Sequence, residues 1–226
     1  MPPATAAPRR LLYVVNEDFA FLLNRLPMAR AARDAGFEVH VATHVNKDAK
    51  FIEAEGFILH DIPLRRGGLS PLAAIPTILA LYRIERRIKP LILHHSGLQC
   101  CIYGSIAAIG SKIRQVNAIT GLGYIFTSVN WRTRILKAAV GRLLPLLLNR
   151  EVSTVLVQNP DDRKALLDLF LPHRRGICGI GISGDDQPDI VALIVQHPMC
   201  GDQGADAFVD QEAPGKAECD GAFRFR

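Results

Sequence analysis

The chain of 226 residues is long enough for one large domain, or for one domain and part of a second. It is 49% hydrophobic and 22% charged, which is a globular composition and excludes disorder over the whole length. The net charge of +5 is uneven: residues 1–172 carry 22 Lys+Arg against 13 Asp+Glu (+9), and residues 173–226 carry 5 against 9 (−4). The basic part predicts affinity for phosphates, anionic lipids or nucleic acid, although an ordinary solvated surface explains the same charge.

Short apolar runs alternate with segments of helical periodicity, the pattern of a doubly wound parallel sheet. The predicted strands are Leu11–Val15, Phe37–Thr43, Phe57–His60, Leu91–His95, Ile113–Ile119 and Val152–Val157. The predicted helices are Phe21–Ala32 with Pro27 as a kink, Ala49–Glu55, Pro71–Ile88, Leu98–Ile109, Trp131–Arg150 and one that begins at Asn159. A Rossmann-like α/β domain is therefore predicted over residues 11–172, after a flexible N-terminus over 1–10.

The alternating pattern ends after Pro172. Ile177–Ile182 and Ile190–Val195 have the composition of short strands, but residues 173–226 are predicted to be an irregular or disordered tail without a complete second domain. Residues 179–184 match G-x-G-x-x-G, yet Asp185 and Asp186 follow directly and would repel a pyrophosphate. Dinucleotide binding is not favoured there, because the fingerprint needs a helix N-terminus.

Cysteine usage and hydropathy bear on the compartment. The five cysteines form no C-x-x-C pair, which predicts neither a disulfide framework nor a zinc site and fits a reducing cytoplasm. No signal peptide is recognised at the N-terminus. The longest apolar stretch, Ile135–Leu148, is too short and too charged to span a bilayer. A cytoplasmic protein without a metal site is expected.

Polar residues follow the first and fourth predicted strands, where ligands bind in open α/β sheets. A carboxylate among Asn16, Glu17 and Asp18 would bind an acceptor hydroxyl or act as a base, or else it stabilises the dipole of the next helix. The pair His94-His95 would serve as a base or a phosphate partner, or would simply pack and hydrogen-bond at the strand end.

The loop Val116–Phe126 leaves the fifth predicted strand and contains two closely spaced glycines. Such glycines allow positive φ and close approach to the backbone. A ligand-binding loop is therefore predicted, and its candidate cleft residues are Asn117, Thr120, Gly121, Gly123 and Tyr124.

Basic residues form two further candidates. Arg65 and Arg66 lie in a glycine-containing loop that suits phosphate recognition, with a solvated loop as the alternative. Trp131–Arg150 joins basic residues to a leucine-rich face, which suits a bilayer surface or packing on the sheet. Few aromatic residues accompany these basic residues, so nucleic acid is not a predicted partner.

Several segments within residues 10–172 form a recognisable set: Tyr13–Asp18, Arg25–Pro27, Ala35–Thr43, Glu55-Gly56, His94-His95, Tyr103–Ser105, Asn117–Phe126 and Gln158–Asp162. Together they resemble the N-terminal domain of family 4 glycosyltransferases of the two-domain GT-B type, in particular bacterial enzymes of surface-polysaccharide synthesis. The resemblance covers three-quarters of the chain, and the loop Asn117–Phe126 is its most specific part.

The resemblance implies transfer of a sugar from a nucleotide-sugar donor to a saccharide acceptor, often lipid-linked, with no structural metal and no cofactor. It implies a cytoplasmic enzyme at the inner face of the plasma membrane, whose N-terminal domain shapes the acceptor side of the cleft. The C-terminal domain of such enzymes binds most of the donor through a Glu-x7-Glu pair, and no two glutamates of this sequence have that spacing.

We therefore expect a truncated glycosyltransferase that lacks the donor-binding domain and is inactive alone. The alternative is a non-catalytic acceptor- or membrane-binding subunit, completed by a separate donor-domain chain. An NAD-type Rossmann enzyme is not favoured, because Val15 leads into the acidic segment Asn16–Asp18 and not into a glycine fingerprint.

Overall fold

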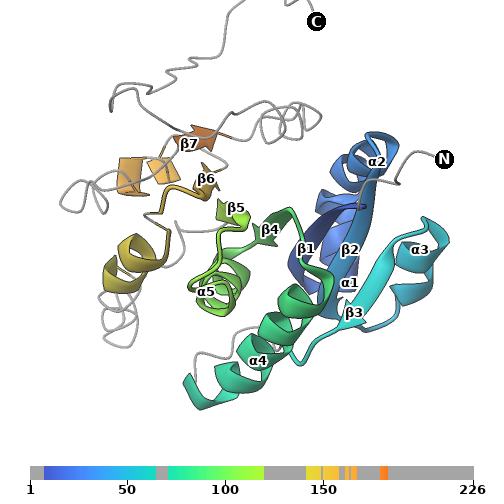
Figure 1. The fold of residues 1–226 in the computed structure, drawn as a ribbon, viewed down its shortest axis with the longest axis horizontal. Coiled ribbons are helices and arrows are strands. Elements are labelled where there is room, and N and C mark those ends of the chain that lie inside the picture. The colour runs from blue at the N-terminus through green and yellow to red at the C-terminus, as the bar shows by residue number, and fades with distance from the viewer. Residues whose placement is uncertain are drawn as a thin grey trace, which may run out of the picture.

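The computed structural model describes residues 8–64, 71–119, 141–148, 150–157, 161–162, 164–166 and 179–182. Figure 1 shows helices alternating with strands along this part of the chain. The strands are β1 Arg9–Glu17, β2 Phe37–His44, β3 Ile58–Asp61, β4 Ile92–Ser96, β5 Arg114–Ile119, β6 Ser153–Val157 and β7 Gly179–Ile182. The helices are α1 Asp18–Asn24, α2 Leu26–Asp34, α3 Ala49–Ala54, α4 Pro71–Ile88 and α5 Leu98–Ala107, and residues 141–148 are also helical.

The described strands form one parallel sheet in the order β3-β2-β1-β4-β5-β6-β7. The chain builds outward from β1 to β3 and then returns through α4 to place β4 on the other side of β1. The strand order therefore reverses between β1 and β4, and their carboxyl ends flank the topological switch point, where open α/β sheets bind ligands. The predicted doubly wound parallel sheet is confirmed.

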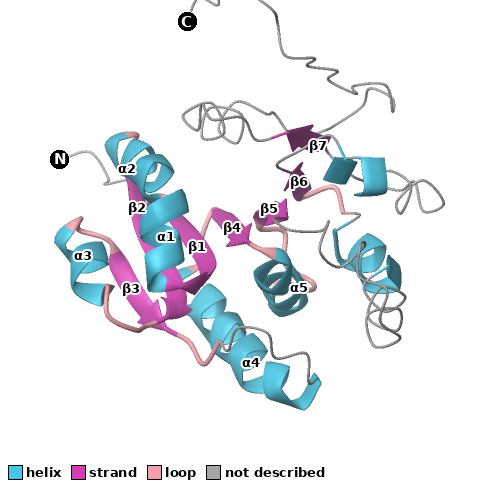
Figure 2. Cartoon of the chain, turned by 180° about the vertical axis from the view of Figure 1, so that it is seen from behind, coloured by secondary structure: helices cyan, strands magenta, loops and turns pink. Residues whose placement is uncertain are grey.

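Helices cover both faces of the sheet (Figures 1 and 2). Alternate residues of β1 point to opposite faces, so Tyr13 packs with Phe21 and Met28 beneath α1 and α2, whereas Leu12 packs with Leu81 on the side of α4 and α5. Because both faces are buried, the central strands read as continuous apolar runs and do not alternate with polar residues.

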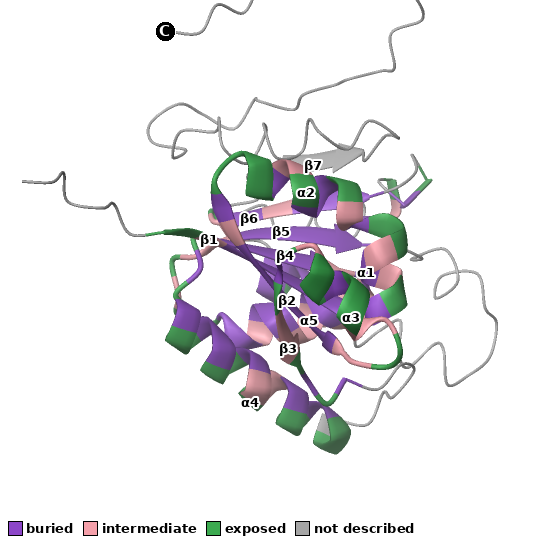
Figure 3. Ribbon diagram, turned by 90° about the vertical axis from the view of Figure 1, so that its right-hand side faces the viewer, coloured by how far each residue is buried: buried purple, intermediate pink, exposed green. Residues whose placement is uncertain are grey.

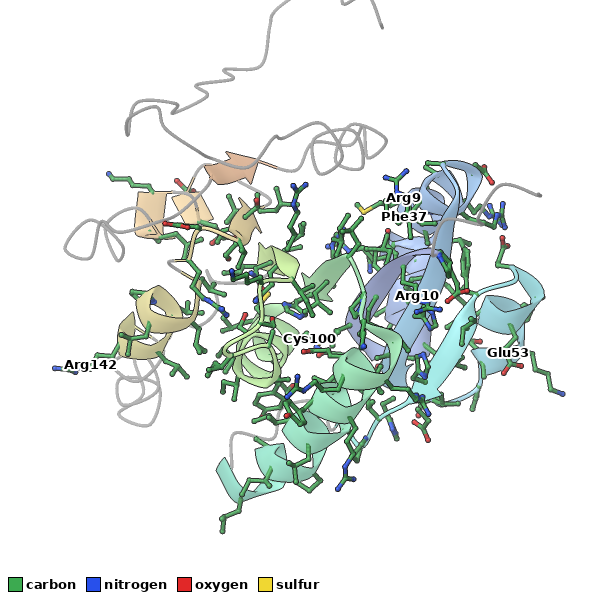
Figure 4. All side chains as sticks on the ribbon, viewed as in Figure 1. Arg9, Arg10, Phe37, Glu53, Cys100 and Arg142 are labelled. Carbon is green, nitrogen blue, oxygen red and sulfur yellow. The ribbon has the colours of Figure 1, made fainter. Side chains whose placement is uncertain are left out.

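Contacts of Arg9 and Arg10 hold the amino end of β1 in place. The Arg9 guanidinium lies 4.1 Å from the ring centroid of Phe37, its register partner on β2 (Figure 4). Arg10 donates from Nε to Glu38 over 2.7 Å and from Nη1 to the Ile88 carbonyl over 3.0 Å. These contacts join β1, β2 and the end of α4 at the edge of the sheet opposite the switch point.

The segment predicted as one kinked helix forms two helices. Arg25 ends α1 and precedes α2, and its backbone leaves the helical region with φ −126° and ψ −10°. Pro27 consequently lies in the first turn of α2. Backbone N–H groups in the first turn have no partner within the helix, so proline costs no hydrogen bond there. The break places the Arg25 side chain at the switch point.

The glycine-rich segment of the predicted tail contributes a strand. Gly179–Ile182 forms β7, which pairs in parallel with β6, in agreement with the expected short strand over Ile177–Ile182. Gly179 and Gly181 are thus strand residues, a position that does not suit a phosphate loop. The rest of the predicted tail, including Ile190–Val195, lies outside the described residues. Among the described helices, none is long and apolar enough to cross a membrane.

Candidate functional site

The candidate site lies at the carboxyl ends of β1 and β4. Val15 of β1 pairs in register with Ser96 of β4, so the residues that follow the two strands emerge side by side. Figure 3 shows the end of this central sheet between α1 and α5. Asn16 and Glu17 are the last residues of β1, Asp18 is the first residue of α1, and Gly97 is the N-cap of α5 after β4.

The two outer members of Asn16–Asp18 have partners that hold the fold. The Oδ1 atom of Asn16 accepts a hydrogen bond from the Cys100 thiol over 2.8 Å, and Cys100 lies on α5 (Figure 4). Burial raises the pKa of Cys100 well above its ordinary value, so the thiol keeps the proton that it donates.

Asp18 is fully buried and accepts three backbone hydrogen bonds: from Phe19 over 2.8 Å, Asn46 over 2.7 Å and Asp48 over 3.0 Å. Burial alone would raise the pKa of this carboxyl group, but the backbone donors outweigh burial and the pKa is lowered. The carboxylate thus ties the start of α1 to the loop between β2 and α3.

Glu17, between them, differs from both neighbours. It is half-buried at the switch point, and within the described part of the chain its carboxylate has no hydrogen bond or ion pair. Of the three predicted residues, Glu17 is therefore the one whose side chain is available to a ligand.

His94 and His95 point to opposite faces of β4. His94 is fully buried, its ring centroid lies 5.0 Å from that of Tyr13, and neither ring nitrogen has a partner among the described residues. Burial lowers its pKa well below the ordinary value, and the nearby charge of Arg25 lowers it further. The imidazole is therefore neutral.

His95 belongs to a buried polar network with Asn117. Its Nδ1 lies 2.8 Å from Asn117 Oδ1, whose own Nδ2 donates to Ser153 over 3.0 Å. Because Oδ1 only accepts, Nδ1 of His95 carries the proton and Nε2 does not. The bare Nε2 faces Gly104 of α5, where a Cβ would overlap the imidazole. Burial lowers the pKa of His95 to about 4, although the Asn117 bond opposes this shift.

Ser105 extends this network within the core. Its hydroxyl lies 3.1 Å from Gln115 Oε1 and 3.4 Å from Asn117 Oδ1. The segment Tyr103–Ser105 thus lets α5 pack closely on these polar strands, because Gly104 has no side chain and Ser105 provides a hydroxyl. His95 and Asn117 are fully buried and face α5 inside the protein.

One residue at the switch point was not among the sequence candidates. Arg25 is only 6% exposed, and its Nε donates to Ser96 Oγ over 3.1 Å. Among the described residues no carboxylate pairs with it. Burial lowers its pKa. A signal was present in the sequence, because a cation immediately before a helix is unfavourable to the helix dipole.

The other predicted positions lie outside the described residues: Thr120, Gly121, Gly123, Tyr124, Arg65 and Arg66. Most of the basic helix predicted over Trp131–Arg150 lies outside them too. Within the part of the chain that is described, no group of three or more His, Cys, Asp or Glu side chains could hold a metal ion.

Solved structures with the same fold include glycosyltransferases. Sucrose-phosphate synthase from Thermosynechococcus elongatus matches with a TM-score of 0.53 and 11% identity, over 77% of this chain and 47% of that chain. A second structure of that protein matches with a TM-score of 0.51 and 12% identity, over 83% of this chain and 96% of that chain. A glycosyltransferase from Rickettsia africae matches with a TM-score of 0.52 and 10% identity, over 78% and 43%. This chain thus spans less than half the length of two of them.

No curated protein matches the chain. A family model does: residues 10–159 match the family described as glycosyl transferase 4-like. The match contains the strands that flank the switch point, together with every predicted cleft residue. With the Rossmann-like architecture of the N-terminal half of a GT-B fold, it shows that this chain belongs to the glycosyl transferase 4-like family.

Proposed function

We propose that this chain forms the acceptor-side domain of a glycosyltransferase that moves a sugar from a nucleotide-sugar donor to a lipid-linked saccharide acceptor. The family match and the topological switch point between β1 and β4 support the proposal. The nucleotide sugar is a substrate, and no resident cofactor takes part. Sugar transfer also requires a donor-binding domain, in a longer form of the protein or in a separate chain. The setting proposed is surface-polysaccharide synthesis in the cytoplasm, at the inner face of the plasma membrane.

Glu17 is the observation that carries the chemical part of the proposal. Its half-buried carboxylate at the switch point has no partner among the described residues. A carboxylate in that position would accept a hydrogen bond from the acceptor hydroxyl and take its proton as the sugar is transferred. By contrast, Asn16 and Asp18 already bond the surrounding fold.

The test is sugar transfer in membranes from cells that lack the gene. Purified chain and cytosol are added with radiolabelled UDP-glucose, UDP-N-acetylglucosamine or GDP-mannose, and label in the lipid fraction is counted. The wild-type chain is expected to restore incorporation, and Glu17→Gln to reduce it by about a hundredfold or more. Glu53→Gln, at an exposed position of α3 (Figure 4), is the control and should restore incorporation fully.

Two results would contradict the proposal. Failure to restore incorporation with any donor, both by the wild-type chain and by a longer form of the protein that contains it, would reject sugar transfer. Tight binding of a nucleotide sugar to the isolated chain through its base and sugar, and not only through its diphosphate, would reject the assignment to the acceptor side, because the donor would then not need a second domain.

The outer face of α4 supports contact with a membrane. Four large apolar residues lie on it at helical spacing: Leu72, Ile75, Leu79 and Tyr82, which are 77%, 49%, 45% and 42% exposed. Figure 3 shows α4 along the outside of the molecule, buried on its inner side and exposed on its outer side. The exposed charged residues near its C-terminal end are all basic: Arg83, Arg86, Arg87 and Lys89.

An apolar stripe beside basic residues suits an anionic bilayer surface, because the lipid tails accept the apolar side chains and the headgroups pair with the cations. Glu85, the one acidic residue of α4, is buried and does not oppose this contact. The same surface would serve the second candidate function, a non-catalytic membrane-binding subunit completed by a separate donor-domain chain.

Vesicle sedimentation tests the α4 surface. The chain is expected to sediment with phosphatidylcholine vesicles that contain phosphatidylglycerol, and less with phosphatidylcholine alone. Ile75→Glu with Leu79→Glu should abolish sedimentation, because two charges would enter the apolar stripe. Phe51→Glu, which changes an exposed apolar residue of α3 on the other side of the sheet, should leave it unchanged. Equal sedimentation of the α4 variant and the control would show that the outer face of α4 is not the membrane-binding surface.

A further inference from the structure

Arg25 is a buried cation whose charge no described residue neutralises. Its side chain is 6% exposed at the junction of α1 and α2, and its one described side-chain hydrogen bond runs from Nε to Ser96 Oγ. A guanidinium carries five N–H donors, so most of its donors are left for another partner. A buried charge without a partner is costly, and folds retain one where a ligand completes it.

The described groups around Arg25 do not supply a negative charge. Within the described part of the chain, the titratable groups that interact with it are Tyr13, His94 and Cys101, and all three are fully buried. Burial raises the pKa of Tyr13 and of Cys101 and lowers the pKa of His94, so each is neutral near pH 7. The hydroxyl of Tyr13 and both ring nitrogens of His94 also lack partners among the described residues.

A second positive feature begins one residue after the Arg25 contact. Ser96 is followed by Gly97, which has φ +91° and caps α5 without any side-chain hydrogen bond. No described side chain caps the ten-residue helix α5, so its first backbone N–H groups and the positive end of its dipole lie next to the residue that Arg25 contacts. Arg25 comes from one face of the sheet and α5 from the other, and Ser96 and Gly97 join them at the switch point between β1 and β4.

We propose that Arg25 and the N-terminus of α5 form a binding site for a phosphate or diphosphate group at this edge. A guanidinium binds phosphate through two parallel hydrogen bonds, and helix N-terminal N–H groups bind the remaining oxygens. The inference rests on the proposed function for the nature of the ligand. In that function the group belongs either to the nucleotide-sugar donor or to the lipid carrier of the acceptor.

Isothermal titration with inorganic pyrophosphate tests the site, at constant ionic strength and with sulfate and chloride as reference anions. Wild-type chain is expected to bind pyrophosphate and not chloride. Arg25→Met should lose binding by at least tenfold while remaining folded by circular dichroism. Lys50→Met, which removes an exposed cation from α3, is the control for net charge and should bind as the wild type does.

The melting temperature separates a ligand-binding role from a structural one. In chloride, Arg25→Met should melt at the same temperature as the wild type or higher, because the substitution removes an unpaired buried charge. In pyrophosphate only the wild type and Lys50→Met should show a rise in melting temperature. A chloride melting temperature well below the wild type, with pyrophosphate binding retained, would show that Arg25 serves the fold and would overturn the proposal.

Arg25→Lys covers the case in which Arg25→Met does not fold. Lysine keeps the charge but lacks the two-pronged geometry, so weaker pyrophosphate binding is expected, and wild-type affinity in this variant would overturn the proposal. UDP and farnesyl diphosphate then identify the source of the phosphate group. Tighter binding of UDP indicates the nucleotide-sugar donor, and tighter binding of farnesyl diphosphate indicates the lipid carrier.

The outcomes for this site and for sugar transfer are independent. If the wild type binds none of pyrophosphate, UDP and farnesyl diphosphate, the proposed anion site is disproved even if sugar transfer is restored. Conversely, pyrophosphate binding without restored transfer would reject the proposed function and leave the anion site standing.

Discussion

Gly104 of α5 and His95 of β4 form a contact in which no side chain beyond hydrogen fits. The imidazole is fully buried, and its bond to Asn117 fixes the ring in place. A Cβ at position 104 would overlap the ring. Glycine in the middle of a helix normally costs about 1 kcal/mol relative to alanine. Its presence here is explained by the close approach of α5 to the polar residues of β4.

Gly104→Ala is accordingly expected to destabilise the protein by about 2 kcal/mol, which is the reverse of the usual effect of this substitution in a helix. Urea unfolding measures the change. His95→Ala removes the obstructing ring, so the double variant should lose much less than the sum of the two single variants. Additive effects, or a stabilising Gly104→Ala, would show that the ring is free to move aside.

At the scale of the element, one carboxylate orders the loops around the switch point. Asp18 begins α1 and receives backbone hydrogen bonds from its own turn and from the loop between β2 and α3. The sequence left two roles open for this residue, a ligand contact or a favourable charge at a helix start. Its partners give it a third role, which joins two loops and so keeps Glu17 in position.

Asp18→Asn should destabilise the chain by about 2 kcal/mol, because an amide N–H₂ group would face backbone donors that need an acceptor. Asp34→Asn, at an exposed position of α2, is the control and should change stability by less than about 0.5 kcal/mol. The pKa of Asp18 is lowered in the folded protein, so the loss should be largest above its unfolded pKa and shrink as the pH falls. Equal effects at both sites in chemical unfolding would disprove the bridging role.

The break between α1 and α2 is also a property of the element. A single kinked helix was expected across Pro27, because proline inside a helix bends it. The chain instead ends α1 at Asn24 and starts α2 at Leu26, which places Pro27 where proline is tolerated. Arg25 lies between the two helices, and its contact with Ser96 accompanies the break.

At the scale of the whole molecule, buried titratable groups shape stability against pH. His94 and His95 are neutral in the folded protein, with the pKa of His95 lowered to about 4. Glu85 of α4 is buried, its Oε1 has no partner among the described residues, and burial raises its pKa to about 8. The histidines favour the folded state at higher pH, and Glu85 favours it at lower pH.

The free energy of unfolding is therefore expected to reach its maximum near pH 6.5. Between the ordinary pKa values of 4.5 for glutamate and 6.5 for histidine, the unfolded chain binds two protons at His94 and His95 while the folded chain binds one at Glu85. The difference, two minus one, raises stability by about 1.4 kcal/mol per pH unit. Above 6.5 Glu85 alone remains, and stability falls by about the same amount per unit until its pKa is passed.

Urea unfolding across this pH range measures the curve. Glu85→Gln keeps the shape of the protonated side chain. It should remove the fall in stability above pH 6.5 and leave the rise in stability below pH 6.5 in place. A variant curve that still declines above pH 6.5 would assign that decline to another group. Burial also lowers the pKa of His60 to about 4. His60 therefore adds to the rise in stability below pH 6.5, but its partial exposure weakens this contribution.

The sequence by itself determined the order of the elements and the class of the fold. Continuous apolar strands between amphipathic helices can bury both faces only in a parallel, doubly wound sheet, and this local pattern is legible without coordinates. It also indicated that Asn16–Asp18 and His94-His95 occupy strand ends. Only the tertiary structure decided what these side chains do, because burial and partners come from residues far apart in the chain. Asp18 bonds Asn46, His95 bonds Asn117, and Arg25 contacts Ser96 with no counter-charge among the described residues. The position of Arg25 beside Ser96 depends on the pairing of β1 with β4, and no local sequence pattern records that pairing.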